Sequence, residues 1–418
     1  MEPSFLEKNG KTILIGMGGL LGVALVVWWY FFYDMRLTVA VTPSSAAVML
    51  DGIDVTGQKQ VKLKPGSHTL KVTLNDYLPL EQTIQAKSNT YVTLPVTLTT
   101  LPHLTLVTKD STTSTSFDAT NHKLYYRNTS ANDAERIDLA SGTSIDSSSV
   151  PKPQVLTPGA LTGIDEWLWG PGYDLGLMRQ GNKWSLYSFN RFDLVHQSTS
   201  SWPDGVGSVA WNPTNVNQLA HYFAPTGGEQ TLIQTDPQHQ TTNRIFNFLN
   251  SAVSAPKVAW VGDGSDMVLL SKEGRLWRFT VYNKTLTAIT QSENVSDMTT
   301  SPDGKTILAK QADGNLFLIG IDGSNKRAID GSLPLAQFAW SADSQSLWMV
   351  TNGDSLGITK LTVADGSKTA YSMANKETVG TIHSISVTDD NSRMALAGSS
   401  GLGLVRLEPS TYPTLTLK

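Results

Sequence analysis

Two kinds of hydrophobic pattern divide this chain. Residues 12–33, TILIGMGGLLGVALVVWWYFFY, form an unbroken run of uncharged and largely apolar positions. From residue 37 onward, short segments instead alternate apolar and polar residues, with the two-residue period of strands that bury one face. The pattern predicts one apolar helix followed by an all-β chain.

The apolar run is long enough to cross a membrane, because a helix needs about 20 residues to span a hydrocarbon core. Trp28, Trp29, Tyr30 and Tyr33 gather at its end, and such amphipathic rings favour the membrane–water interface. A cleaved signal peptide has a shorter apolar region followed by small residues. We therefore expect an uncleaved transmembrane helix over residues 12–33, with the lipid bilayer as its partner.

The charges that flank the run favour one orientation. Lys8 and Lys11 precede it, and Asp34 and Arg36 follow it. Positive flanks are retained in the cytoplasm, so we expect residues 1–11 to be a cytoplasmic tail. The predicted location is the cell membrane, with a single pass and with the C-terminal domains outside the cytoplasm.

Residues 37–99 predict a small antiparallel β-sandwich of five or six strands, separated by Asp-Gly and Pro-Gly turns. The predicted strands are LTVAVTP (37–43), AAVMLDG (46–52), KQVKLKPG (59–66), HTLKVTL (68–74) and NTYVTLPVTL (89–98).

This segment resembles the PEGA domain in the proline that ends its first strand, Pro43, in its Asp-Gly and Pro-Gly turns, and in Tyr77 after a short turn. The eponymous tetrapeptide keeps only its first and last members here, in PSSA (43–46), and Asp76 replaces the glycine that usually precedes the tyrosine. The resemblance implies a spacer or adhesion-type module of prokaryotic surface proteins, and not an enzyme.

Residues 100–418 repeat a unit of strand, turn and strand every 40 to 52 residues, and several copies continue into two more strands. Four strands per repeat at this spacing is typical of a β-propeller, because neighbouring blades cover the apolar faces that one blade cannot cover alone. We predict seven blades, with six or eight as alternatives. The equivalent positions are Phe117, Trp169, Trp211, Trp260, Thr300, Trp340 and Val387.

Two of the copies, SPDGKTIL (301–308) and WSADSQSL (340–347), resemble TolB-like propellers, which are relatives of WD-repeat proteins. Either HLTLVT (103–108) or YPTLTLK (412–418) is expected to complete a blade shared by both ends of the domain, which would close the ring. The Ser/Pro-rich stretch 141–159 is interpreted as a loop inserted between the first two blades, with shielding of the edge of blade 1 or contact with the small β domain as alternatives.

The large residues at the equivalent positions, Phe117, Trp169, Trp211, Trp260 and Trp340, are interpreted as packing between blades. A carbohydrate-stacking platform is the alternative. We name no catalytic, ligand-binding or metal-binding residue, and we expect no cofactor.

The composition and the absence of known motifs exclude several classes of function. The chain has no cysteine and a net charge of −4, which argues against thiolate chemistry and against a nucleic-acid partner. No hydrolase elbow, Walker loop, Rossmann fingerprint or calcium loop is present, and no two histidines have metal-ligand spacing. We expect a non-enzymatic surface protein whose propeller binds a protein or a polysaccharide. The alternatives are a propeller hydrolase or lyase acting on envelope glycans or peptides, and a subunit of an envelope assembly.

Overall fold

The computed structural model describes residues 19–23, 26, 34–118, 120–139, 152–157, 161–189, 198–352 and 356–407. Residues 19–23 and 26 are helical, with exposed side chains. Within these described ranges, no helix is long and apolar enough to cross a membrane. Most of the predicted transmembrane segment 12–33 lies outside the described residues, as do Trp28, Trp29, Tyr30 and Tyr33.

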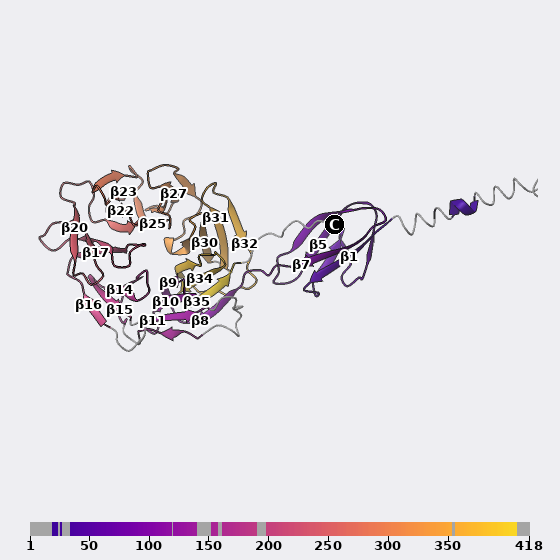
Figure 1. Ribbon diagram of the computed structural model, residues 1–418, viewed down its shortest axis with the longest axis horizontal. Coiled ribbons are helices and arrows are strands. Elements are labelled where there is room, and N and C mark those ends of the chain that lie inside the picture. The colour runs from indigo at the N-terminus through magenta and orange to yellow at the C-terminus, as the bar shows by residue number, and fades with distance from the viewer. Residues whose placement is uncertain are drawn as a thin grey trace, which may run out of the picture. The chain divides into compact units, whose positions relative to one another are not determined.

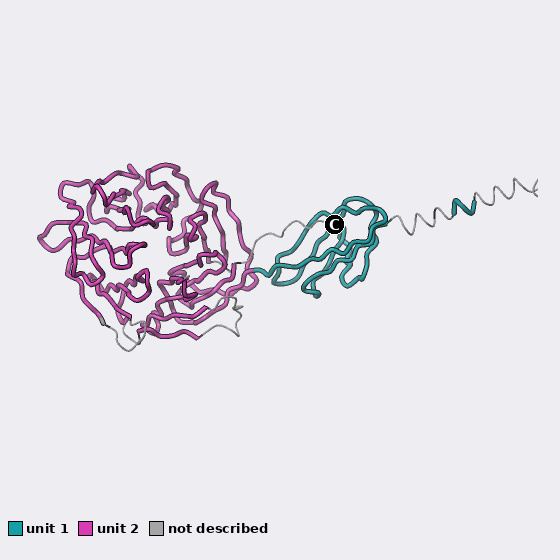
Figure 2. The backbone as a smooth tube through the Cα atoms, in the orientation of Figure 1, with its two compact units in different colours: residues 1–101, 408–418 teal, residues 102–407 magenta. Residues whose placement is uncertain are grey.

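The chain divides into two compact units, one comprising residues 1–101 and 408–418 and the other residues 102–407 (Figure 2). The folded part of the first unit is a sandwich of two sheets, with strand orders β4-β1-β7 and β3-β2-β5-β6. Its strands are β1 (Met35–Thr42), β2 (Ala47–Leu50), β3 (Ile53–Asp54), β4 (Val61–Leu63), β5 (Gly66–Thr73), β6 (Leu80–Ala86) and β7 (Tyr91–Thr97).

Alternation places one face of the longer strands in the core of this sandwich. Leu70 and Val72 of β5 are fully buried, while Thr69 and Lys71 between and beside them are exposed. The prediction of a purely antiparallel sandwich is wrong, because β1 and β7 pair in parallel along their whole length. Hydrophobic alternation predicts which side chains face inward, but it carries no information on the direction of the neighbouring strand.

The described residues of the second unit form seven four-stranded antiparallel sheets, which Figure 1 shows arranged in a ring. Blade 1 contains β9 (Thr112–Asp118), β10 (Lys123–Asn128), β11 (Asp133–Asp138) and β12 (Gln154–Val155). Blade 2 contains β13 (Glu166–Trp169), β14 (Leu175–Gln180), β15 (Lys183–Ser188) and β16 (Ser198–Ser201). Blade 3 contains β17 (Val206–Trp211), β18 (Leu219–Phe223), β19 (Thr231–Thr235) and β20 (Thr242–Asn247). Blade 4 contains β21 (Lys257–Trp260), β22 (Asp266–Leu270), β23 (Leu276–Thr280) and β24 (Thr285–Ala288).

Blade 5 contains β25 (Val295–Thr300), β26 (Thr306–Gln311), β27 (Leu316–Gly320) and β28 (Arg327–Ile329). A short 3-10 helix, η1 (Leu335–Gln337), leads into blade 6, which contains β29 (Phe338–Trp340), β30 (Ser346–Asn352), β31 (Leu356–Thr362) and β32 (Lys368–Tyr371). Blade 7 contains β33 (Ile382–Val387), β34 (Arg393–Gly398) and β35 (Gly401–Arg406), and its fourth strand is β8 (Leu104–Thr108) from the start of the domain.

The ring is closed by β8, which pairs antiparallel with β35. Of the two closing segments that the sequence offers, the structure therefore uses 104–108, while 412–418 lies outside the described residues. A buried hydrogen bond from the Thr112 hydroxyl to the Gly401 carbonyl (3.0 Å) ties blade 1 to blade 7 at this closure.

Seven buried apolar clusters hold the ring together, and each draws its side chains from two neighbouring blades. Strand β22 shows why the central strands are apolar at consecutive positions. Met267 faces the cluster shared with blade 3, while Val268 faces the cluster shared with blade 5, and both are fully buried. A strand covered on both faces needs an apolar residue at every position, which is the reason for the MVLL run at 267–270.

The interpretation of residues 141–159 as a loop is wrong for residues 154 and 155, which cover the edge of blade 1 as the alternative interpretation expects. Gln154 and Val155 form β12, the outermost strand of blade 1, and they pair with Arg136 and Glu135 of β11. A strand of two exposed residues beside prolines carries no periodicity, so the sequence gives no signal for it.

Candidate functional site

The structure places the predicted blade-packing residues on the innermost strands of five blades. They are Phe117 on β9, Trp169 on β13, Trp211 on β17, Trp260 on β21 and Trp340 on β29. Thr300 and Val387 occupy the same place on β25 and β33.

Two of these tryptophans bind the backbone of the preceding blade. Trp169 donates its indole N–H to the Ser114 carbonyl (2.6 Å), and Trp260 donates to the Ala210 carbonyl (3.1 Å). The indole N–H groups of Trp211 and Trp340 are buried without a hydrogen-bond partner in the described part of the chain. The tryptophans therefore contribute apolar contact at four of the blades and a directional bond at two of them.

The innermost strands of blades 1 to 5 also line a cavity of about 470 Å³ in the central channel. Its walls include Trp167, Trp169, Trp211 and Trp260, and the remaining lining residues are small apolar or hydroxyl side chains and Pro213. General acid–base catalysis needs a titratable group within hydrogen-bonding reach of the reacting atoms. None of the described residues that line this cavity is ionisable.

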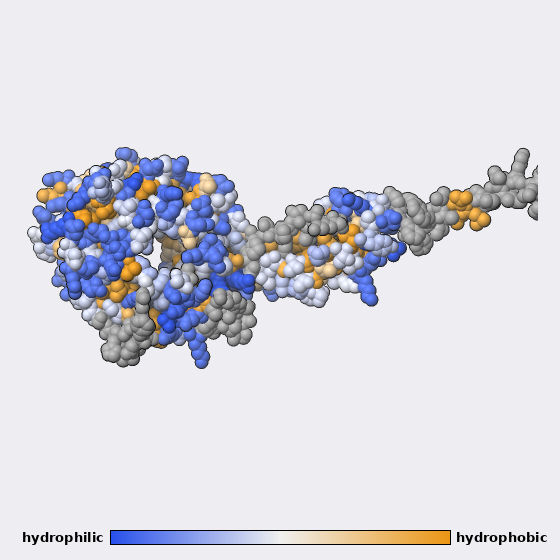
Figure 3. Space-filling model, viewed as in Figure 1, coloured by the Kyte–Doolittle hydropathy of each residue, from blue (hydrophilic) through white to orange (hydrophobic). Residues whose placement is uncertain are grey.

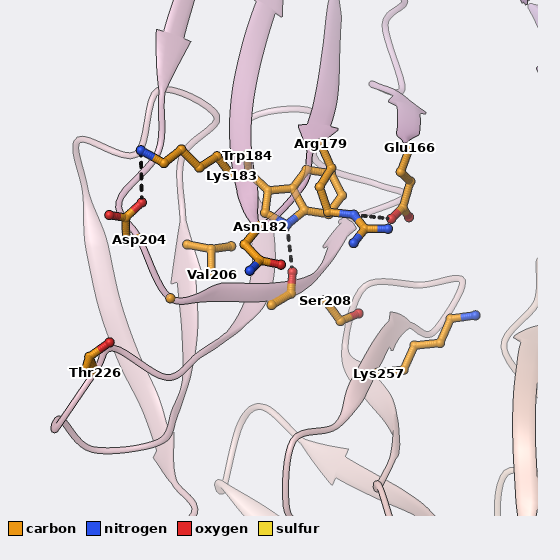
Figure 4. Close-up of a pocket in the computed structure, with 12 residues that line it drawn as sticks. Glu166, Arg179, Asn182, Lys183, Trp184, Asp204, Val206, Ser208, Thr226 and Lys257 are labelled. Atoms are coloured by element: carbon orange, nitrogen blue, oxygen red, sulfur yellow. Dashed lines mark hydrogen bonds and ion pairs between the residues drawn. The ribbon is translucent and has the colours of Figure 1, made fainter. Parts of the chain in front are cut away.

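A second and larger site lies where the innermost strands begin. In an antiparallel blade, the start of the first strand, the end of the second and the start of the third share one edge, so these positions form one face of the ring. We call it the start face. Blades 2, 3 and 4 contribute to a groove of about 880 Å³ on this face, which we call the start-face groove (Figure 4). Its lining includes Glu166, Arg179, Asn182, Lys183, Trp184, Asp204, Val206, Ser208, Thr226 and Lys257.

Paired charges surround the start-face groove. Arg179 Nε lies 3.0 Å from Glu166 Oε2, and Lys183 Nζ lies 3.6 Å from Asp204 Oδ1. Lys257 Nζ reaches Asp297 of blade 5 at 2.5 Å. The lining therefore presents both signs of charge, paired with each other in partly or largely exposed positions.

Trp184 forms the buried floor beside these pairs. Only 2% of the residue is exposed, and its indole N–H donates to the Gly207 carbonyl of blade 3 at 2.9 Å. A Cβ atom at Gly207 would lie 2.8 Å from the Tyr222 ring, so this position needs glycine for the backbone to pass so close. The Arg179 guanidinium lies 5.9 Å from the Trp184 ring centre, which adds a cation–π contact.

The start face of blade 3 also exposes one large apolar side chain. Leu249, just after β20, is 69% exposed. Figure 3 shows apolar residues on the visible face of the ring as separate patches among polar ones, with a hollow at the centre. The start face therefore combines the charged residues of the groove with one exposed apolar side chain on blade 3.

The structure brings together two histidines that are 18 positions apart in the sequence. His221 of β18 is fully buried, and its Nε2 lies 3.2 Å from Nε2 of His239 in the turn between β19 and β20. Burial lowers the pKa of His221 to about 4, and burial also lowers the pKa of His239. The sequence does not predict this pair, because the two histidines do not have the short spacing of a recognised motif. One lies on strand β18 and the other in the turn between β19 and β20.

The pair has the character of a hydrogen bond between neutral rings. His221 Nδ1 lies 3.3 Å from the Tyr222 carbonyl, which fixes the proton on Nδ1 and leaves Nε2 to accept from His239. Trp202 covers both rings, with its own centre 5.5 Å from that of His221 and 5.0 Å from that of His239. Among the residues that the structure describes, no group of three or more potential metal ligands is found.

Comparison with known proteins supports the two folded parts separately. Residues 35–101 match the PEGA domain family. The β-propeller domain of Cps50 (Swd1) from Myceliophteria thermophila superimposes with a TM-score of 0.51 at 13% sequence identity, covering 73% of this chain and 100% of that domain. No curated protein matches the chain. The chain thus combines a region similar to PEGA domains with a region that has the β-propeller fold.

Proposed function

We propose that this chain is a membrane-anchored binding scaffold whose propeller holds a protein or polysaccharide partner in the start-face groove. The groove carries the proposal, because charged and hydrogen-bonding side chains from blades 2, 3 and 4 converge there on one concave surface. The fold supports a binding role, since loops on a rigid ring hold such side chains in fixed positions. The PEGA region then acts as a spacer between the anchor and the ring.

The anchor is part of this proposal and is supported by the uncharged run at residues 12–33. We propose that the N-terminus lies in the cytoplasm and that both folded units lie outside it, at the cell surface. Protease treatment of intact cells is expected to remove the propeller. A propeller that stays protected until the cells are lysed would reverse this orientation.

The groove is tested by placing a photo-crosslinking amino acid at Asn182 in the full chain, in cells. Asn182 is exposed in the turn between β14 and β15 and lines the groove. Asn217 is the matched control, because it is exposed in a turn of blade 3 at the opposite ends of the strands. We expect a defined crosslinked product from position 182 and none of that mass from position 217. Digestion with protease or with glycosidases then distinguishes a protein partner from a polysaccharide.

A pair of substitutions tests the same surface by obstruction. Asn182→Arg with Thr226→Arg adds bulk and charge to two exposed lining residues and leaves the buried floor intact. We expect capture of the partner to fall about tenfold, as for a perturbed interface centre. The control pair, Asn217→Arg with Thr287→Arg, changes exposed residues elsewhere on the ring. Equal capture by the two double variants would refute the groove as the binding site.

A further inference from the structure

One end of the small sandwich gathers basic side chains around an exposed tyrosine. Strand β1 enters there at Met35, and the strand register places Arg36 between Lys62 of β4 and Tyr91 of β7. The Arg36 guanidinium carbon lies 5.2 Å from the Tyr91 ring centre. Tyr91 is 64% exposed, although large aromatic rings are usually buried.

Two more lysines belong to the same end. Lys64 follows the last residue of β4, and Lys87 follows the last residue of β6. Strand pairing brings these strand ends together, because Met35 lies opposite Leu63 and Gly66 lies opposite Ala86. We call this set, Arg36, Lys62, Lys64, Lys87 and Tyr91, the basic end.

Among the residues that the structure describes, more cationic side chains than carboxylates gather at this end. Asp51 is engaged by His68, with 2.5 Å between Oδ2 and Nδ1, and Asp34 lies just before β1. Lys62, Lys64 and Lys87 are all exposed. Farther from the basic end, Lys71 is paired with Glu81 across β5 and β6 at 3.3 Å. The positive charge of the unit is therefore concentrated at the end where the chain enters it.

The short stretch of chain between the apolar run and β1 limits how far the basic end can lie from the membrane. The apolar run ends at residue 33, and three residues of fully extended chain reach at most about 11 Å. Arg36, and the strand partners on either side of it, must then lie within roughly one head-group layer of the bilayer surface if residues 12–33 span the membrane. We infer that the basic end of the sandwich contacts anionic lipid head groups of the membrane in which the anchor is inserted. This inference rests on the anchor in the proposed function.

The side chains present suit that partner. Lysines and arginines near an anionic bilayer each favour contact by about fivefold in the equilibrium constant. Tyrosine places an apolar ring and a hydroxyl at the level where hydrocarbon meets water. The contact holds the basic end of the first folded unit against the membrane. The sandwich is then a spacer that rests on the membrane surface. The inference holds for either leaflet, since it depends on the distance along the chain and on charge.

The absence of native cysteine allows single-site labelling of the full chain. We would place a fluorophore on Ser88→Cys in the turn between β6 and β7, beside Lys87, and in a second protein on Thr97→Cys at the far end of β7. Both native residues are exposed, and the two positions differ by about 30 Å along the strand. The probe is a phosphatidylcholine with a nitroxide on its head group, in vesicles with or without phosphatidylglycerol at equal nitroxide content.

We expect strong quenching of the label at position 88 in vesicles that contain phosphatidylglycerol, weaker quenching in neutral vesicles, and little at position 97 in either. High salt should remove the difference between the lipids, because it screens surface charge. Replacing Lys62, Lys64 and Lys87 with glutamine should lower the contact equilibrium constant by on the order of 100-fold. The control variant replaces the exposed propeller lysines Lys272, Lys284 and Lys305 with glutamine and so has the same net charge as the first triple variant. It should be quenched like the parent protein.

The anchor and the contact fail in different ways in this experiment. If alkaline carbonate extracts the full chain from neutral vesicles, the anchor is wrong. Two outcomes would refute the head-group contact in a chain that resists extraction, and both would leave the anchor intact. In the first, quenching at position 88 does not depend on phosphatidylglycerol. In the second, quenching falls equally in the two triple variants.

Discussion

The buried histidine pair makes the stability of the propeller depend on pH in a predictable way. His221 is fully buried against His239 and Trp202, and burial lowers its pKa to about 4, against 6.5 in an unfolded chain. Between these two values, the unfolded chain binds a proton that the folded chain does not bind. Stability is therefore complete above about pH 6.5 and is lost as the pH falls toward 4.

The magnitude follows from that difference in pKa. Each unit is worth about 1.4 kcal/mol, so His221 alone removes about 2.5 kcal/mol of unfolding free energy between pH 7 and pH 4.5. His239 acts with the same sign, since burial lowers its pKa too. Asp236 lies in the same turn. Burial raises its pKa, but hydrogen bonds from the backbone N–H groups of Gln240 and Thr241 outweigh this and lower it. Its contribution to the unfolding free energy is therefore lost only at more acidic pH.

The assay is denaturant unfolding of the full chain at a series of pH values, followed by tryptophan fluorescence. All tryptophans except Trp28 and Trp29 lie in the propeller, so the signal reports that unit. His221→Gln keeps an acceptor for His239 and cannot titrate, and it should remove most of the slope between pH 7 and pH 4.5. The control is His122→Asn at an exposed turn with a positive φ of 51°, where asparagine is tolerated. A variant at position 221 that keeps the parental slope would refute the reasoning.

Two further predictions concern the construction of the ring. Leu104→Ala in β8 removes a buried side chain, 1% exposed, from the cluster that joins blades 6 and 7. It should lower the unfolding free energy by about 2–5 kcal/mol. Thr108→Ala on the same strand is the control and should have a smaller effect. Arg278→Leu leaves the Asp266 carboxylate, whose side chain is 5% exposed, without the guanidinium that lies 2.5 Å away, and should cost about 2 kcal/mol. Adding Asp266→Asn should recover part of that loss in denaturant unfolding. A double variant that is less stable than Arg278→Leu would contradict the assignment of the penalty to the stranded charge.

The sequence predicted the features that recur and missed those that occur once. Apolar runs such as MVLL at 267–270 recur because every blade interface needs them, and tryptophan recurs at the equivalent position of four blades, so repetition alone indicates a propeller. The two-residue strand β12 and the parallel pairing of β1 with β7 have no such repetition and went unseen. The start-face groove was also missed. Glu166, Asp204 and Lys257 are far apart in the sequence, and only ring geometry brings them to one surface.

The closure of the ring and the shape of the groove are physically connected. The floor of the groove depends on a bond from blade 2 to blade 3, from Trp184 to Gly207, and one of its charged walls is held by the pair between Lys257 of blade 4 and Asp297 of blade 5. Such bonds keep their lengths only if the blades cannot slide or separate. Pairing of β8 with β35 removes the one interface at which a chain of blades would otherwise open. The closed ring therefore fixes the shape of the groove, and under the proposed function this lowers the entropy lost when a partner binds. The proposed binding role relies on this shape, because ring geometry brings charges from separate blades to one surface.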